Sequence, residues 1–383
     1  MKFDNFSIKQ LLILLATAIA SMLLSGQVEF WLPENSHMDL NKYFGMAEAF
    51  PSLNTNIVKP FVFRIISPWL AGSLPFSIPI NFYILNFISL ILFSFVFFLF
   101  LIEHKIDSTI ALALTICFQL NRYFFQFLSW DYFHLTDSLS YVILFSSFIL
   151  LRKKKWLPLF LILPLGILVK EYVVLIIPVG YAYLFLHKSS KNEIIKFSIL
   201  TFLMAIVFLG IRVLIKAESG ESLFSQYITQ VVYYSNPIAL LKRFIVPFTP
   251  FGLLPIIFYK DIYRFFVKHK YLFVYFLSVL AITFFGEPER LIAPLAPIHF
   301  TFLGFLLQNT FSNGHYFYSK KVTLITIIGL SFLSSFYHLW GIVKFPNSTF
   351  TIISTILLSV TTVLFFIFLN RKNQIKIDYK SNQ

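Results

Sequence analysis

The stretch 152–191 decides the fold of this chain, and it reads RKKKWLPLFLILPLGILVKEYVVLIIPVGYAYLFLHKSSK. Basic clusters flank an apolar run that is interrupted at its middle by Lys170-Glu171. One long helix would put the two clusters on opposite faces of a membrane and two charges at mid-span, where each charge costs about 2.5–3.5 kcal/mol. A helical hairpin keeps both clusters on one face. The pattern therefore predicts a hairpin whose turn is Lys170-Glu171.

Each arm of this hairpin is short. An arm of about 14–15 residues spans about 22 Å, whereas the hydrocarbon core is about 30 Å thick. We therefore expect the turn to lie within the outer leaflet, in a water-filled depression. Charges at that depth are candidates for function. The alternative is a structural Lys–Glu pair.

The composition extends this interpretation to the whole chain. Of the 383 residues, 58% are hydrophobic and 13% are charged, whereas about 25% are charged in soluble domains. Mean hydropathy is +0.78. The apolar runs lack the alternation of an outer-membrane barrel, and a backbone in lipid must satisfy its own hydrogen bonds. We predict an all-α polytopic transmembrane bundle that forms one domain, 1–383.

The apolar runs predict twelve membrane crossings. They lie near 8–25, 80–102, 107–121, 137–151, 156–169, 172–186, 194–215, 246–259, 271–286, 290–308, 322–340 and 351–369. The first run follows Lys2 and Lys9 and is expected to be a retained anchor, with a cleaved signal peptide as the alternative. Cys117 is the single cysteine, so no disulfide can form within the chain.

The distribution of Lys and Arg orients these crossings, because cytoplasmic loops are enriched in positive charge. An N-terminus inside places these segments in the cytoplasm: 1–9, 103–106, 152–155, 187–196, 260–270, 309–321 and 370–383. They hold 20 of the 31 basic residues and a minority of the 17 acidic residues. The net charge of +14 therefore reflects membrane topology, and nucleic acid is not an expected partner. Both termini are expected in the cytoplasm of an inner-membrane protein, with 370–383 as a short tail.

Outward segments carry the remaining candidates for function. Residues 40–50 have amphipathic helical spacing and follow Asp39, which either caps that helix or serves as a general base. Arg64 is a lone charge in an apolar stretch, and it either snorkels to lipid phosphate or holds a substrate phosphate. Two more outward turns supply ionisable residues: Asp131, His134 and Asp137 in one, Glu289 and Arg290 in the other. Asp137 has helix capping as its alternative role, and Arg290 a local salt bridge.

Several chemistries are disfavoured by what the sequence lacks. The short cytoplasmic loops carry no Walker loop and no glycine-rich dinucleotide fingerprint, so a soluble nucleotide-sugar donor is not expected. No pair of histidines has metal-ligand spacing beside carboxylates, and no Gly-x-Ser-x-Gly elbow occurs. We expect no cofactor, and chemistry, if present, on the outward face.

The chain resembles the GT-C superfamily, the polytopic glycosyltransferases that take sugar from polyprenyl-phosphate donors, and it is similar to the small bacterial members. Four short motifs carry the resemblance: Asp39 after the first span, Phe63-Arg64-Ile65-Ile66-Ser67-Pro68, Leu168-Val169-Lys170-Glu171, and Glu289-Arg290. His37-Met38-Asp39 stands where paired acidic residues are common in the family, which puts metal dependence in doubt.

The resemblance implies a GT-C-like architecture and an inverting sugar transfer at the outer membrane face. Asp39 would be the catalytic base, while Lys170, Arg290 and Arg64 would hold the donor phosphate; Asp131, His134, Asp137, Glu171 and Glu289 would complete the substrate site. The partners would be a polyprenyl-phosphate sugar, membrane lipids, and a glycan, lipid or protein acceptor. The main alternative is a transporter or flippase of a lipid-linked sugar or other anion. An O-antigen-type polymerase and a non-catalytic scaffold are further alternatives.

Overall fold

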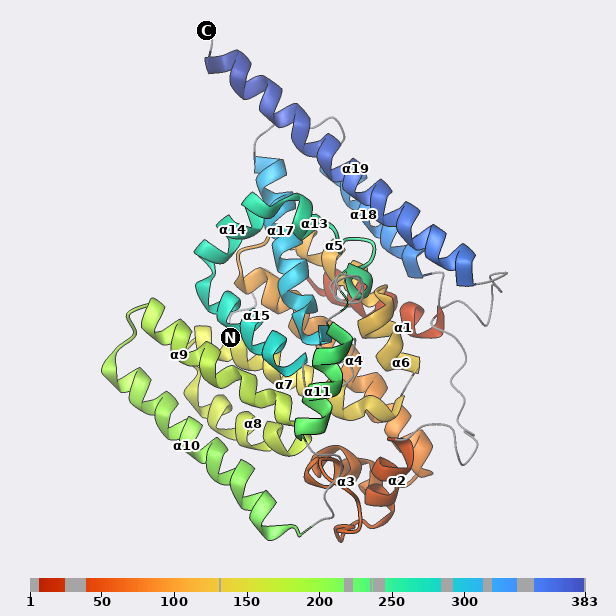
Figure 1. Cartoon of the computed structure of the whole chain (residues 1–383), viewed down its shortest axis with the longest axis vertical. Helices are drawn as coiled ribbons and strands as arrows, with labels where there is room; N and C mark the ends of the chain where they lie inside the picture. The colour runs from red at the N-terminus through yellow and green to blue at the C-terminus, as the bar shows by residue number, and fades with distance from the viewer. Residues whose placement is uncertain are drawn as a thin grey trace.

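The computed structural model describes residues 7–24, 39–130, 132–216, 223–234, 236, 245–283, 292–312, 319–335 and 348–381. Within these residues every regular element is a helix (Figure 1). The all-α prediction is therefore confirmed for the part of the chain that the structure describes.

The elements up to the predicted hairpin are α1 (Ile8–Leu24), α2 (Leu40–Glu48), η1 (Phe61–Phe63), α3 (Ile66–Ser73), α4 (Ile78–Glu103), α5 (Ser108–Gln119), η2 (Arg122–Gln126), α6 (Phe127–Trp130), η3 (Tyr132–His134) and α7 (Leu135–Arg152). The hairpin and the elements after it are α8 (Trp156–Val169), η4 (Glu171–Leu175), α9 (Ile176–Leu186), α10 (Lys191–Leu214), α11 (Leu223–Tyr234), η5 (Val246–Phe248), α13 (Leu254–Ile257), α14 (Tyr259–Lys268), α15 (Lys270–Ile282), η7 (Ala293–Leu295), α17 (Ala296–Ser312), α18 (Lys320–Ser335) and α19 (Ser348–Ser381).

Four helices of the described part are long and apolar enough to cross a membrane: α4, α7, α10 and residues 353–370 of α19. The pair α14 and α15, bent by 110°, would add a fifth if it counts as one span. Further apolar helices, including α1, α5 and α8, are shorter than a full crossing. A membrane-embedded helical protein is supported, whereas the count of twelve crossings stays a prediction.

One expected crossing, near 246–259, does not exist as a continuous helix. The structure has the short turns η5 and α13 there, separated by 249–253. Pro247, Pro250 and Pro255 explain the interruption, because proline has no N–H for a helical hydrogen bond and clashes with the preceding turn. Gly252 also sits where an added Cβ would lie 2.1 Å from the Ile245 carbonyl oxygen. The prediction was wrong because it weighed hydropathy above these helix breakers.

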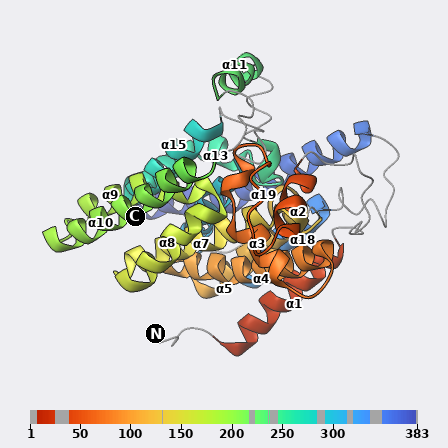
Figure 2. The same ribbon diagram turned by 90° about the horizontal axis from the view of Figure 1, so that it is seen from below.

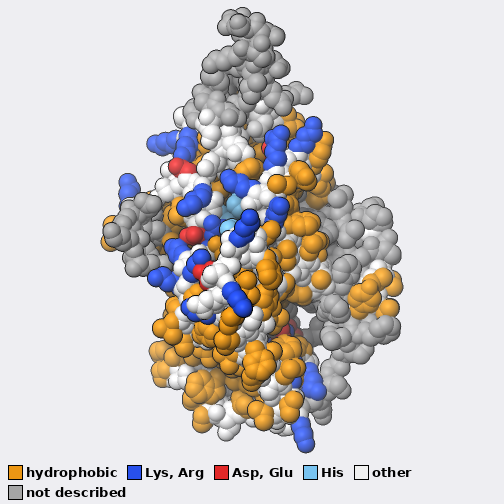
Figure 3. Space-filling view, turned by 90° about the vertical axis from the view of Figure 1, so that its left-hand side faces the viewer, with side chains coloured by type: hydrophobic (Ala, Val, Ile, Leu, Met, Phe, Trp, Pro, Cys, Tyr) orange, Lys and Arg blue, Asp and Glu red, His pale blue; other side chains and the backbone are white. Residues whose placement is uncertain are grey.

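Lipid exposure is clearest on α10. Phe202, Leu209 and Val213 are 67%, 59% and 75% exposed on this helix. Figure 3 shows a broad hydrophobic area on the lower part of the side that it presents, with Lys and Arg gathered above it. Large contiguous apolar surfaces mark membrane or protein contact sites. The exposed apolar side chains of α10 are typical of such a surface.

Four of the segments predicted to be cytoplasmic lie close together: 103–106, 152–155, 187–196 and 309–321. Ion pairs join them: Glu103–Arg152 (3.5 Å), Lys154–Glu193 (2.7 Å) and Lys320–Asp107 (2.7 Å). Burial opposes the charged form of Asp107, but the hydrogen bond from Lys320 and the helix-start amides outweigh it and lower the pKa of this carboxyl. These contacts define one end of the helix bundle, which we call the basic end. The compartment that it faces stays a prediction.

The basic cluster 152–155 is predicted to anchor the topology by facing lipid headgroups, without a catalytic role, but Arg152 turns inward. Its side chain is 17% exposed and donates hydrogen bonds to the Tyr271 hydroxyl and to the Glu103 carbonyl oxygen. It therefore joins α4, α7 and α15 inside the bundle. The role is structural, as expected, but the partners are protein groups.

The hairpin of α8 and α9 is present. Lys154, just before α8, pairs with Glu193 at the start of α10. Glu171, at the turn after α8, lies 3.8 Å from Arg212 near the other end of α10. The chain therefore travels from the basic end to the opposite end along α8 and returns along α9. Lys170-Glu171 forms the turn, as the flanking basic clusters predicted.

Helices α2 and α3 cover the end of the bundle that contains this turn. They lie at the lower end of Figure 1, and Figure 2 looks onto them from below. Figure 2 also shows α11 and α1 on opposite sides of the molecule. We call the end under α2 and α3 the polar end, because the ionisable side chains described below meet there.

The two ends provide a topology prediction. Leu53, which precedes α3 and is 43% exposed, and Lys188, which follows α9 and is exposed, lie at opposite ends. In intact cells, Leu53→Cys should react with a membrane-impermeant maleimide, whereas Lys188→Cys should react only after permeabilisation. Buried Cys117 provides the unlabelled background. Labelling of position 188 alone from outside would reverse the orientation.

Candidate functional site

Arg64 is the centre of the polar end. It follows η1, where the chain turns into α3. Its Nε donates to Glu171 Oε2 at 3.1 Å, and its Nη1 donates to the Tyr43 hydroxyl at 2.7 Å. Burial alone would lower the pKa of this guanidinium, but Glu171 and Tyr43 outweigh it and raise the pKa. Arg64 is therefore a fixed cation with protein partners and does not snorkel alone.

Tyr43 holds Arg64 from the amphipathic helix. The expected helix over 40–50 is confirmed as α2, which buries Leu40, Tyr43, Met46 and Ala47. Burial raises the pKa of the Tyr43 hydroxyl, and Arg64 partly opposes that rise. The hydroxyl is therefore protonated at neutral pH, and its oxygen accepts hydrogen bonds from Arg64 and, at 3.4 Å, from Thr136.

A second group of charges lies deeper. The Lys170 ammonium contacts Asp137 Oδ1, and His134 Nδ1 lies 3.4 Å from Asp137 Oδ2. These three residues are 5%, 3% and 3% exposed. An isolated charge buried this deeply would be very costly, so the Lys170–Asp137 pairing is what makes the burial tolerable. Asp137 therefore has a charged partner across the bundle and is more than a helix-capping residue.

The backbone at the hairpin turn separates the two charged groups. Lys170 has φ −163° and ψ 145°, which is extended and ends α8. Successive side chains in an extended segment point to opposite sides. Lys170 is accordingly directed inward to Asp137, whereas Glu171 is 26% exposed and lies beside Arg64.

Arg212 completes the outer group from α10. Its Nη2 lies 3.8 Å from Glu171 Oε1, and its Nη1 donates to the Phe208 carbonyl oxygen at 3.0 Å. The guanidinium also stacks on the rings of Phe208 and Phe63. Two guanidinium groups thus share the carboxylate of Glu171. We call Arg64, Glu171 and Arg212 the outer cluster, and His134, Asp137 and Lys170 the inner cluster.

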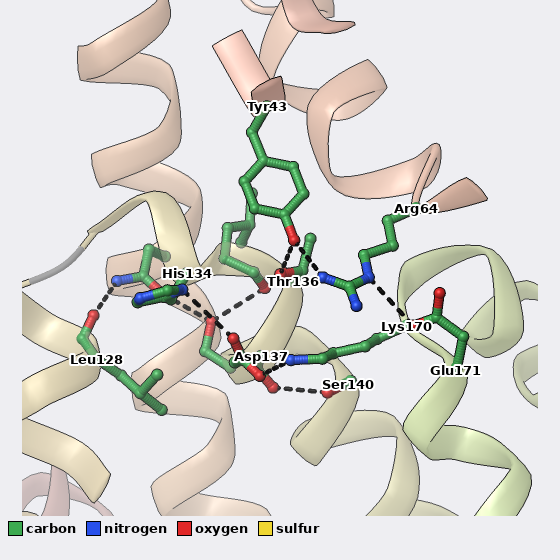
Figure 4. A network of polar contacts seen from close by, with 12 residues as sticks. Tyr43, Arg64, Leu128, His134, Thr136, Asp137, Ser140, Lys170 and Glu171 are labelled. Atoms are coloured by element: carbon green, nitrogen blue, oxygen red, sulfur yellow. Dashed lines mark hydrogen bonds and ion pairs between the residues drawn. The ribbon is translucent and has the colours of Figure 1, made fainter. Parts of the chain in front are cut away.

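Figure 4 shows how close the two clusters lie. Tyr43 points down between Arg64 and the start of α7, and Lys170 reaches across to Asp137 beneath the guanidinium. The Asp137 charge also acts on Arg64 and Tyr43. Side chains that lie far apart in the sequence therefore form one network at the end of apolar helices. Intramembrane ionisable groups in such a position are functional-site candidates.

Asp39 lies at the edge of this network. It is the N-cap of α2, but its side chain makes no capping hydrogen bond. Its carboxylate lies 3.6 Å from Lys42 and is 21% exposed. Lys42 sits 4.2 Å from the centre of the Phe61 ring, and Arg64 stacks on the same ring. One aromatic ring thus separates the Asp39–Lys42 pair from the outer cluster.

The structure brings together five of the predicted site residues: Arg64, His134, Asp137, Lys170 and Glu171. Asp131, Glu289 and Arg290 lie outside the described residues, as does His37 of the first loop. Sequence reasoning missed Tyr43 and Arg212. Arg212 had a signal, because it is a cation far inside a predicted crossing, 194–215, at the end away from the basic segment 187–196. The only sequence signal for Tyr43 was its position one helical turn after Asp39.

Metal binding has no support in the described residues. They contain no group of three or more His, Cys, Asp and Glu side chains placed to hold an ion. Of the two carboxylates nearest Arg64, Glu171 is engaged by guanidinium groups and Asp137 by an ammonium group. The chemistry that these groups offer is anion binding and proton transfer.

Comparison with known proteins adds no assignment. No protein-family model matches this sequence, and no curated protein matches it.

Proposed function

We propose that this chain is a membrane glycosyltransferase of the GT-C type. It would move a sugar from a polyprenyl-phosphate donor to a glycan, lipid or protein acceptor at the outer face of the cytoplasmic membrane. One observation carries the proposal: two guanidinium groups share a single carboxylate at the end of the bundle opposite to the basic end. That arrangement suits a phosphate group delivered within a lipid layer, because guanidinium binds phosphate through parallel N–H donors.

The residues suggest how transfer would proceed. The acceptor hydroxyl gives its proton to the Asp39 carboxylate, and its oxygen attacks the anomeric carbon. The bond from that carbon to the phosphate oxygen breaks, and its electron pair leaves with the polyprenyl phosphate. Arg64 and Arg212 stabilise the negative charge that grows on this leaving group. Attack from the side opposite to the leaving group inverts the anomeric centre.

The geometry gives Lys170 a different role from the one that the resemblance implies. Its ammonium group is buried against Asp137. We propose that it positions the hairpin turn that carries Glu171, without touching the donor. Arg212, on α10, takes its place as a phosphate ligand.

Substitution of Arg212 tests the phosphate site. In sugar transfer with the purified chain, Arg212→Gln should raise the donor KM about 10- to 100-fold, since a hydrogen bond to a charged group contributes about 1.5–3 kcal/mol. The matched control is Arg264→Gln on α14, whose side chain is 71% exposed and lies at the basic end. An unchanged donor KM in Arg212→Gln would remove this residue from the site.

A transporter for a lipid-linked sugar or another anion is the second candidate. The buried Lys170–Asp137 pair with its neighbouring histidine favours it, because such groups also form proton relays in transporters. Proteoliposomes distinguish the two functions. Movement of an intact lipid-linked sugar between leaflets, without transfer to any acceptor, would favour the transporter.

A further inference from the structure

Glu171 occupies an unusual position between two cations. It accepts one hydrogen bond, from Arg64 Nε at 3.1 Å. Its other oxygen, Oε1, is buried and accepts no hydrogen bond in the described part of the chain, although Arg212 Nη2 lies 3.8 Å away. Arg64 and Arg212 repel each other across this carboxylate. Glu171 therefore offsets one of the two positive charges while leaving part of the hydrogen-bonding capacity of the guanidinium groups unused.

Both cations have contacts besides the carboxylate. Arg64 is fixed by the Tyr43 hydroxyl and the Phe61 ring, and Arg212 by the Phe208 carbonyl and the Phe63 ring. Glu171 is 26% exposed and stands on a turn beside an extended residue. A small rotation of its side chain would leave both guanidinium groups in place.

We propose that Glu171 is an internal counter-ion, which fills the anion site when the site is empty and gives way to the phosphate of the donor. This inference rests on the proposed function. Two unpaired guanidinium groups near lipid would be costly, so a carboxylate stabilises the empty site. The two non-bridging oxygens of a phosphate diester would both accept hydrogen bonds from the guanidinium groups, whereas Glu171 accepts only one. Exchange therefore favours an anionic phosphate over a neutral group.

The exchange also fits the course of the transfer reaction. The donor phosphate is a diester with one negative charge, which only matches the charge of the carboxylate that it displaces. When the sugar leaves, the phosphate gains a second charge. The attraction between the two guanidinium groups and the phosphate is therefore strongest as the bond breaks. An interaction that is stronger in the transition state than in the ground state accelerates a reaction. A permanently open cation pair would instead bind the ground state and the transition state more equally.

Removal of the counter-ion should strengthen phosphate binding. With the purified full chain in detergent and farnesyl phosphate as the probe, Glu171→Gln should bind about tenfold more tightly than the unmodified chain, because one charge-assisted hydrogen bond no longer competes. Without ligand, the variant should melt at a lower temperature, and farnesyl phosphate should raise its melting temperature more. Farnesol, which lacks the phosphate, should bind both chains equally.

Two further variants control this test. Glu48→Gln removes an exposed carboxylate at the end of α2 and should leave farnesyl phosphate binding unchanged. Glu171→Asp keeps the charge on a side chain one methylene shorter, so it should also bind the probe more tightly and covers the case in which Glu171→Gln does not fold.

The outcomes separate this inference from the proposed function. If farnesyl phosphate binds the unmodified chain better than farnesol, but both Glu171 variants bind it equally or more weakly, Glu171 positions the guanidinium groups and the counter-ion proposal is wrong. If farnesyl phosphate binds no better than farnesol to any of these chains, the phosphate site itself is absent and the proposed function fails with it.

Discussion

Lys170→Met is expected to destabilise the folded chain by about 3–5 kcal/mol, the cost of leaving one member of a buried ion pair without its partner. The substitution removes the ammonium group but keeps an unbranched side chain of similar length. Asp137, which is 3% exposed, would then have to lose its charge or draw water into the bundle. Thermal and denaturant unfolding in detergent would measure the loss.

A double substitution separates the charge from the packing. Lys170→Met combined with Asp137→Leu should recover most of the stability, because a buried ion pair replaced by apolar side chains is often neutral or stabilising. Lys153→Met is the matched control: Lys153 pairs with Glu103 at 3.5 Å but is 38% exposed, so its loss should cost less than about 1 kcal/mol. A similarly small cost for Lys170→Met would show that the inner cluster is solvated.

The hairpin that contains Lys170 was predictable because the charges that determine it lie within one short stretch of sequence. Two basic clusters must reach water at the same face, and the charges between them must avoid the hydrocarbon core. The same reasoning correctly grouped the segments of the basic end, where Lys154 pairs with Glu193. It failed over 246–259, where prolines break the helix although the stretch is apolar. Hydropathy indicates where the chain is buried, and backbone chemistry decides whether it is helical there.

The candidate site was predictable only in part, for a different reason. The candidate residues were chosen from the predicted outward turns, and the side chains of five of these residues lie together in the structure. The pairing did not follow from the sequence: Lys170-Glu171 looked like a pair, yet the structure turns Lys170 to Asp137 and Glu171 to Arg64. Adjacent residues in an extended segment face opposite ways, and the conformation at 170 depends on how η4 packs. Partners separated by 33 and 107 residues require the folded chain.

Asp39→Asn is the prediction that bears most directly on catalysis. If the Asp39 carboxylate accepts the acceptor's proton, the amide cannot, and kcat should fall by about 10²–10⁴. The donor KM should stay within a few-fold of its original value, because Arg64 and Arg212, which bind the phosphate, are untouched. Stability should change by less than about 1 kcal/mol, since Asp39 has a partly exposed ion pair with Lys42.

The split between kcat and KM distinguishes a base from a residue that merely supports α2. A structural Asp39 would also loosen Tyr43, one helical turn away on α2, and through it Arg64, so both KM and the melting temperature would change. Asp261→Asn on α14 controls for the chemistry of the substitution, because Asp261 is paired with Arg264 at the basic end. Transfer that survives in Asp39→Asn within a factor of ten would exclude Asp39 as the base. Asp137 would then be the next carboxylate to test, because Glu171 is already shared by the two guanidinium groups. The test would then move to the inner cluster, where a base must first be released from Lys170.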